Sequence, residues 1–269
     1  MSATEQIRLV VFDWAGTTVD YGSSAPSDAF VRIFEDEGIR LTRAEINTPM
    51  GMEKRAHIRT LLTSPSGARQ WLAIHGKPAQ DADIGRLYRA FEAVLEALLE
   101  ARSVLLDGVV ETVAALRAAG IAIGSTTGYS AKMMQYVAPC AAELGYQPDC
   151  IVTPEVTGSG RPGPFMLLEC MRRLDIYPPR AVVKVGDTAV DMREGVNAGA
   201  WSVGVLEGSS MLGLSAKEYA ALTAEELQRL REDATARYRS AGADLVIGSI
   251  RELPQAIAAL NRRLAEEQR

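Results

Sequence analysis

Several residues of this sequence stand where buried strands are expected to end. Residues 7–13 (IRLVVFD) show the pattern, because a short β-branched run stops at a carboxylate. The residues placed in this way, together with one cation that precedes a helical pattern, are Asp13, Thr127, Gly128, Arg161 and Asp187. Ligands bind outside the carboxyl ends of parallel strands, so we expect these residues to converge on one site.

A lysine and a histidine form a second candidate group, between the first strand pattern and the next. Lys54 and His57 are three residues apart in a helical pattern, so their side chains share one face of a helix. A lysine amine can condense with a carbonyl to form an imine, and a nearby histidine can relay protons to and from that amine. Taken alone, such a lysine is more often a solvated surface residue.

The elements that must position these residues alternate through the second half of the chain. Strand patterns separated by helical patterns occur at 121–126, 149–152, 181–186, 201–206 and 243–247. From Ser27 to about Arg102 the periodicity is helical throughout. The sequence therefore predicts an α/β fold, a doubly wound parallel sheet with an inserted all-helical cap domain. We expect a catalytic core of residues 1–20 and 100–269 and a cap of residues 21–99.

Composition excludes several classes of function. The chain has 29 Lys and Arg against 34 Asp and Glu, a net charge of −5, and no basic run that would bind nucleic acid. Its three scattered cysteines and two histidines suggest neither a disulfide framework nor a zinc cluster. No stretch approaches the roughly 18 apolar residues of a membrane span, and the start lacks a signal-peptide pattern. We therefore expect a cytoplasmic protein with no nucleic-acid or membrane partner.

The order of the motifs resembles that of the haloacid dehalogenase superfamily. The matching stretches are Asp13-Trp14-Ala15-Gly16-Thr17-Thr18, Thr127-Gly128, Arg161-Pro162 and Gly186-Asp187-x-x-x-Asp191. The resemblance covers the whole chain, including a helical cap directly after the first motif. It implies a Rossmannoid core in which Asp13 attacks phosphorus to form an aspartyl phosphate. It also implies that Thr127, Gly128 and Arg161 hold the substrate's phosphoryl oxygens.

The same resemblance implies a Mg²⁺ site. Asp13, the backbone carbonyl of Ala15 and Asp187 would be the metal ligands. A carboxylate cannot approach a phosphoryl dianion unless a divalent cation and a guanidinium offset the repulsion. We expect Asp191, one helical turn after Asp187, to orient these groups from behind, with a helix cap or a surface role as the alternative.

Ala15 is the position that departs from the phosphatases of the superfamily, which carry a second Asp there. That carboxyl protonates a leaving alkoxide, so its absence predicts a leaving group other than an ester oxygen. A carbon leaving group needs an electron sink, and a protonated imine on Lys54 could supply it. The amine must be neutral to attack a carbonyl. We expect burial and a cationic neighbour, Arg55 or Arg161, to lower its pKa.

The Ala15 motif and the stretch Met50-Gly51-Met52-x-Lys54-x-x-His57 together resemble the phosphonatase family of this superfamily. The resemblance implies a small-molecule phosphonate substrate, phosphonoacetaldehyde, whose C–P bond is hydrolysed to acetaldehyde and orthophosphate. Asp13, Lys54 and His57 would be catalytic, with Lys54 forming a Schiff base. The resemblance also suggests a homodimer formed through the cap. An exposed apolar face on a helix such as 83–101 would be the natural contact.

Two alternatives stay open from the sequence. A dehalogenase of the same superfamily also lacks the second Asp, but it attacks carbon and needs no Mg²⁺, so Gly186-Asp187-x-x-x-Asp191 counts against it. The other alternative is a catalytically inactive, phosphatase-like binding protein. A metal requirement for turnover separates the first alternative from a phosphonatase. Borohydride trapping of an imine on Lys54 distinguishes a phosphonatase from the inactive binding protein.

Overall fold

One six-stranded parallel sheet, in the order β3-β2-β1-β4-β5-β6, organises the computed structural model, which describes residues 6–267. Its strands are β1 (Leu9–Phe12), β2 (Ala122–Thr126), β3 (Cys150–Val152), β4 (Val182–Gly186), β5 (Trp201–Val205) and β6 (Leu245–Ile247). The chain places β2 and β3 on one side of β1 and the last three strands on the other side. The predicted doubly wound sheet is confirmed, and its strand order reverses between β1 and β4, where ligands of such sheets bind.

The two central strands end level with each other. β1 and β4 are buried along their whole length, and Leu9 pairs with Val182 while Phe12 pairs with Val185. The backbone N–H of Asp13 then donates to the Val185 carbonyl at 2.9 Å. This register brings the residues that follow both strands to the same edge of the sheet.

Helices cover both faces of the sheet. They are α6 (Val109–Ala118), α7 (Ala131–Glu143), α8 (Pro154–Thr157), α9 (Phe165–Arg173), α10 (Ala189–Ala198), α11 (Ala216–Ala221), α12 (Ala224–Ser240) and α13 (Leu253–Glu267). Side chains alternate along β1, so Val10 and Phe12 join the buried cluster that contains residues of α6, α7 and α13. Leu9 and Val11 join a second cluster with residues of α9 on the opposite face.

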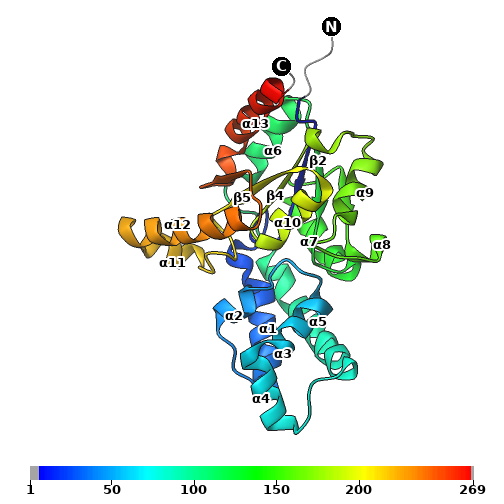
Figure 1. Cartoon of the computed structure of the whole chain (residues 1–269), viewed down its shortest axis with the longest axis vertical. Helices are drawn as coiled ribbons and strands as arrows, with labels where there is room; N and C mark the ends of the chain where they lie inside the picture. Colours follow the sequence, from blue (N-terminus) through cyan, green and yellow to red (C-terminus); the bar gives the residue numbers. More distant parts are fainter. Residues whose placement is uncertain (1–5, 268–269) are drawn as a thin grey trace.

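Residues Ser24–Arg102 form helices and no strand. The helices are α1 (Ser24–Asp36), α2 (Arg43–Asn47), α3 (Lys54–Thr63), α4 (Pro65–His75) and α5 (Asp81–Arg102), and the 3-10 turn η1 (Tyr21–Ser23) precedes them. We call α1–α5 the helical insert. Figure 1 shows it at the end of the molecule opposite the two termini, below the carboxyl ends of β1 and β4.

The helical insert packs against the rest of the chain through its longest helix. α5 contacts α1 and α3 within the insert and α7 outside it, and Glu96 of α5 pairs with Lys132 of α7. The apolar side chains of α5, such as Phe91 and Leu95, are buried in this packing. Among the side chains that the structure describes, no large exposed hydrophobic lies on α5. The buried side of α5 therefore packs within the chain, whereas Tyr88, Val94 and Leu98 are half-buried, and the homodimer through the cap remains a prediction.

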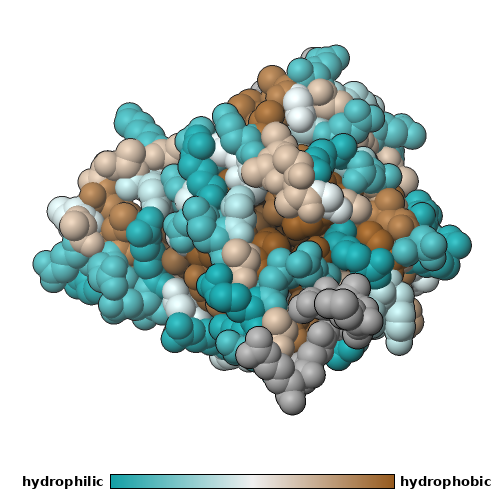
Figure 2. Space-filling view, turned by 90° about the horizontal axis from the view of Figure 1, so that it is seen from above, coloured by the Kyte–Doolittle hydropathy of each residue, from teal (hydrophilic) through white to brown (hydrophobic). Residues whose placement is uncertain are grey.

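The surface at the end that carries the termini is mainly hydrophilic, with hydrophobic patches between the polar side chains (Figure 2). Within residues 6–267, no helix is both long enough and apolar enough to cross a membrane.

Candidate active site

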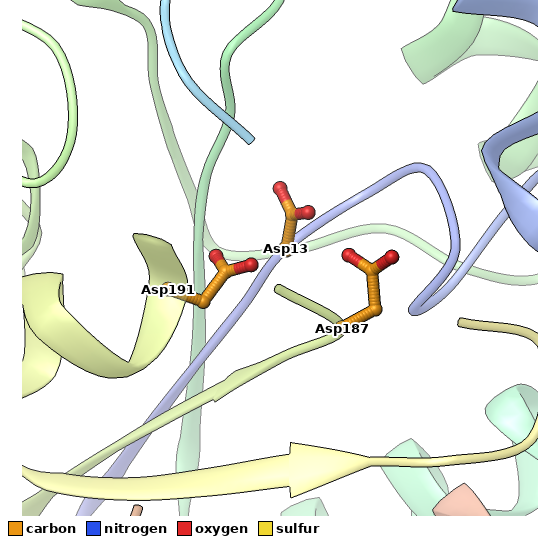
Figure 3. A group of neighbouring side chains, drawn as sticks. All are labelled: Asp13, Asp187 and Asp191. Atoms are coloured by element: carbon orange, nitrogen blue, oxygen red, sulfur yellow. The ribbon is translucent and has the colours of Figure 1, made fainter. Parts of the chain in front are cut away.

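Three buried carboxylates meet at the edge of the sheet where β1 and β4 end. One oxygen each from Asp13, Asp187 and Asp191 lies within 4.8 Å of the others. Figure 3 shows the three carboxylates around one space, carried by the segments after β1 and β4 and by the start of α10. The sequence-predicted convergence of Asp13 and Asp187 is thus observed, and Asp191 joins them.

The carboxylates lie in an environment that favours a cation. Burial and the charges of Asp13 and Asp191 raise the pKa of Asp187 well above its usual value. Burial also acts to raise the pKa of Asp13, but the nearby charges of Arg161 and Lys184 outweigh it and hold that pKa below its usual value. Like charges this close repel one another, so a divalent cation among them would be strongly stabilising.

The oxygen donors at this site fit Mg²⁺, which prefers carboxylate and carbonyl oxygens. Ala15 lines the same small cavity as Asp13 and Asp187. A side chain at the next residue, Gly16, would collide with the Asp187 carboxylate, so the backbone passes directly beside that group. The ligand set of Asp13, Asp187 and the Ala15 carbonyl remains a prediction.

The guanidinium of Arg161 donates hydrogen bonds to two of the three carboxylates. Its Nη2 donates to Asp13 Oδ1 at 2.5 Å, and its Nη1 donates to Asp191 Oδ1 at 2.7 Å. The guanidinium is fully buried. Asp191 also caps α10, because its Oδ2 accepts from the backbone N–H and the hydroxyl of Thr188. Asp191 therefore caps the start of α10, which was one alternative from the sequence, and it also pairs with Arg161. Its role in orienting the site remains a prediction.

Two further charged residues of the site were not identified from the sequence. Lys184 lies within β4 and Glu194 lies on α10, and both side chains are buried. Lys184 Nζ is 3.0 Å from Glu194 Oε2 and 3.1 Å from Asp191 Oδ1. One signal was available, since a lysine inside the apolar run 182–186 must find buried partners if that run is a central strand.

Lys54 belongs to the helical insert, and its side chain is buried where the insert faces the carboxylates, as the imine hypothesis requires. It is the first residue of α3 and only 4% exposed. Within the described chain its Nζ makes no hydrogen bond or ion pair, and it lies 5.3 Å from the centre of the Tyr129 ring. Burial lowers the pKa of Lys54 to about 8, with the positive charge of Arg161 acting in the same direction. Of the two arginines proposed from the sequence, Arg161 is the one that contributes.

His57 is a neutral base one turn further along α3. Its Nε2 donates to the Ile46 carbonyl at 2.9 Å, whereas its buried Nδ1 has no hydrogen-bond partner in the described chain. Burial and the charge of Lys54 hold the pKa of His57 well below its usual value. The ring is therefore neutral, with an unpaired Nδ1 lone pair, and its catalytic role remains a prediction.

Thr127 and Gly128 close the site from β2. The Thr127 hydroxyl accepts from the Tyr129 backbone N–H at 3.0 Å, and both Thr127 and Gly128 line the cavity that contains Asp13 and Lys54. A Cβ at Gly128 would lie 2.6 Å from the Met52 carbonyl oxygen. Gly128 is thus one point where the segment before α3 closely approaches the edge of the sheet.

The cavity between Asp13 and Lys54 is small, about 20 Å³, close to the space that one water molecule needs. A cleft of about 580 Å³ shares Lys54 and Gly128 with this cavity, and its lining includes Arg161, Glu53, Tyr88 and Glu155. The insert is therefore closed over the carboxylates, with a wider space next to the lysine.

The fold and the site together define a class of protein, the haloacid dehalogenase-like hydrolases. The family model of these hydrolases matches residues 7–199, which is more than half of the chain. The chain belongs to this family.

Relatives within that class are more specific. The chain is 43% identical over 258 residues to the phosphonoacetaldehyde hydrolase of Bacillus cytotoxicus, covering 96% of this chain and 98% of that protein. It is 42% identical to a phosphonoacetaldehyde hydrolase-like protein of Syntrophobacter fumaroxidans, covering 98% and 95%. The crystal structure of a phosphonoacetaldehyde hydrolase-like protein from Oleispira antarctica superimposes with a TM-score of 0.95 at 38% identity, covering 99% and 96%. Within its class the chain belongs to the phosphonoacetaldehyde hydrolase family.

Proposed function

We propose that this chain hydrolyses the C–P bond of phosphonoacetaldehyde to acetaldehyde and orthophosphate, using Mg²⁺, an imine on Lys54 and an aspartyl phosphate on Asp13. The observation that carries the proposal is the shared cavity of Lys54 and Asp13. An unpartnered, buried amine with a pKa of about 8 faces a carboxylate that stays ionised. Near neutral pH a useful fraction of that amine is neutral and able to attack a carbonyl.

The reaction begins at the aldehyde. Neutral Lys54 Nζ attacks the aldehyde carbon to form a carbinolamine. The carbinolamine then takes up one proton from solvent and loses water, which gives a protonated imine. The Nδ1 atom of His57 is the base on the same helix face that can take a proton from the attacking amine and return it to the departing water.

The carboxylate then takes the phosphoryl group. An Asp13 oxygen forms a bond to phosphorus while the C–P bond breaks, and the electron pair of that bond moves into the imine to leave a neutral enamine. Protonation of the enamine carbon and addition of water release acetaldehyde and free Lys54. A second water hydrolyses the aspartyl phosphate to orthophosphate and Asp13.

The remaining groups stabilise charge on the phosphoryl oxygens. Mg²⁺, held by Asp13, Asp187 and the Ala15 carbonyl, would supply the positive charge that lets a carboxylate approach a phosphoryl dianion. Arg161 offers a guanidinium next to Asp13, and the Thr127 hydroxyl is a further donor at the end of β2.

Borohydride reduction in the presence of phosphonoacetaldehyde tests the proposal. We expect irreversible inactivation and a stable secondary amine on the peptide that contains Lys54. Lys54→Arg should lose both the adduct and turnover, because a guanidinium keeps the charge but cannot form the imine. Lys77→Arg, an exposed lysine of the same insert, is the matched control and should behave as the unmodified protein does. Turnover without any adduct on Lys54 would contradict the mechanism.

A further inference from the structure

Glu194 lies behind Arg161, on the side away from the cavity. Its Oε2 forms an ion pair with Arg161 Nε at 3.2 Å, although the Nε–H group makes no hydrogen bond among the described residues. Three carboxylates therefore lie around one guanidinium. Each nitrogen of the guanidinium therefore lies next to a different carboxylate: Nε next to Glu194, Nη1 next to Asp191 and Nη2 next to Asp13. Asp191 and Glu194 are three residues apart on α10, so both reach Arg161 from one helix face.

Glu194 is itself held by two neighbours from the sheet. The Thr126 hydroxyl donates to Glu194 Oε2 at 2.9 Å and accepts from Lys184 Nζ at 2.7 Å. Lys184 Nζ also lies close to Glu194 and Asp191, so its three N–H donors have three acceptors. We call Glu194, Lys184 and Thr126 the buried platform. It joins β2, β4 and α10 directly beneath Arg161.

The proposed chemistry makes one partner of Arg161 temporary. When Asp13 becomes an aspartyl phosphate, its attacking oxygen no longer carries a full negative charge, and Nη2 must turn to a phosphoryl oxygen. The partners at Nε and Nη1 do not take part in the reaction. They can hold the guanidinium plane still while the third partner changes, and preorganised donors of this kind are what stabilise developing charge.

We propose that Glu194 is a positioning residue for phosphoryl transfer, which, through the buried platform, fixes the orientation of the Arg161 guanidinium against Asp13. The inference rests on the proposed function, since it takes the phosphoryl group to be what Asp13 receives. The inference gives a role to Glu194 and Lys184, whose buried charges are needed neither for imine formation nor for metal binding. Buried ion pairs are often no more stabilising than apolar residues of similar size, so stability alone gives little reason for this arrangement.

Glu194→Gln keeps the shape of the side chain and removes its charge. We expect kcat on phosphonoacetaldehyde to fall about 10- to 100-fold, as for other residues that orient a catalytic group. Inhibition by orthovanadate with Mg²⁺ should weaken by a similar factor, because the vanadate oxygens need Arg161 in place. Cyanoborohydride trapping of acetaldehyde on Lys54 should be unchanged, because imine formation does not use Arg161's fixed orientation.

Three further variants distinguish a positioning role of Glu194 from an effect on protein folding and from an effect on the balance of buried charges. Thr126→Val should show a smaller loss of the same kind, since it removes one support of Glu194. Glu169→Gln is the matched control, because Glu169 also pairs with two arginines, Arg172 and Arg173, but on the surface of α9. The double variant Lys184→Met with Glu194→Gln removes one charge of each sign. Recovery of kcat in that variant would show charge balance and overturn the proposal.

Orthovanadate keeps this test independent of the substrate. If the unmodified protein binds vanadate but does not turn over phosphonoacetaldehyde, the proposed function fails and vanadate affinity alone decides the role of Glu194. Unchanged vanadate affinity in Glu194→Gln would overturn the positioning role. An equal loss of vanadate affinity and of the Lys54 adduct would also overturn it, because that pattern indicates general disruption.

Discussion

Two buried lysines of this protein have opposite surroundings. Lys184 Nζ lies against Thr126, Asp191 and Glu194, and all its donors are occupied. Lys54 Nζ faces the Phe30 and Tyr129 rings and has no such acceptor within the described residues. Burial without such acceptors penalises the ammonium form of Lys54 and lowers its pKa. Partners, rather than residue type, distinguish an anchoring lysine from one that can react.

The Lys54 environment predicts a pH dependence for imine formation. With a pKa of about 8, the rate of acetaldehyde trapping by cyanoborohydride should rise about tenfold per pH unit below that value and level off above it. Only the neutral amine attacks, and a lowered pKa makes it available at lower pH. In Asp13→Asn the midpoint should move to lower pH, because the Asp13 charge favours the ammonium. A midpoint near that of a free lysine would contradict this account.

At the scale of elements, the short segment before α3 determines how closely the insert approaches the sheet. Gly51 has a φ of +88°, and a side chain there would lie 2.6 Å from the Thr188 hydroxyl. On the other side, the Met52 and Gly51 carbonyl oxygens face Gly128. Because these close contacts occur at glycines, α3 can bring its first residue, Lys54, up to the carboxylates.

Gly128→Ala tests this close approach. Its added Cβ would lie 2.6 Å from the Met52 carbonyl, so the insert must stay slightly open, and we expect kcat/KM to fall about 10- to 100-fold. The melting temperature should change little, because only the contact with the insert is affected. Gly85→Ala is the control: its Cβ would make an ordinary contact at 3.6 Å with the Arg55 side chain of α3, and it should stabilise α5 by up to about 1 kcal/mol. Unchanged kcat/KM in Gly128→Ala would rule out this role.

Across the whole molecule, negative charge collects where the sheet, α10 and the insert meet. Four buried carboxylates, those of Asp13, Asp187, Asp191 and Glu194, surround the Arg161 and Lys184 cations. Among the described residues of the site, these four buried carboxylates outnumber the three buried cations Lys54, Arg161 and Lys184, and a bound cation would offset the difference. Metal binding and folding stability should therefore be linked.

Urea denaturation with and without Mg²⁺ measures this linkage. At a Mg²⁺ concentration 100 times the dissociation constant, stability should rise by about 2.7 kcal/mol. Asp187→Asn should remove that response. Without Mg²⁺ it should be more stable than the unmodified protein, because the raised pKa of Asp187 reflects a charge that folding penalises. Asp36→Asn, an exposed aspartate paired with Arg32, should keep the Mg²⁺ response. A Mg²⁺ response retained in Asp187→Asn would exclude Asp187 as a ligand.

Local pattern was enough to predict much of the fold and the residues at its strand ends. Period-2 and period-3.6 patterns are set by neighbouring residues, so they predicted the alternating strands and helices and the helical stretch before Arg102. They missed α8 and α11, which are under two turns long and carry little periodicity. Asp13 and Asp187 were identified because the end of a buried strand is itself a local feature.

Only the tertiary structure decided which charged residues are buried and with which partners. A helix pattern places Lys54 and His57 on one face but does not say what covers that face, and here the closed insert buries both. Glu194 reaches Thr126 across 68 residues of sequence, a contact that no local pattern contains. Periodicity likewise did not show which apolar residues of α5 are buried within the chain, and the structure identifies Phe91, Leu95 and Leu99 among them. Burial and charge pairing depend on segments distant in sequence, and these two properties determine the chemistry of the site.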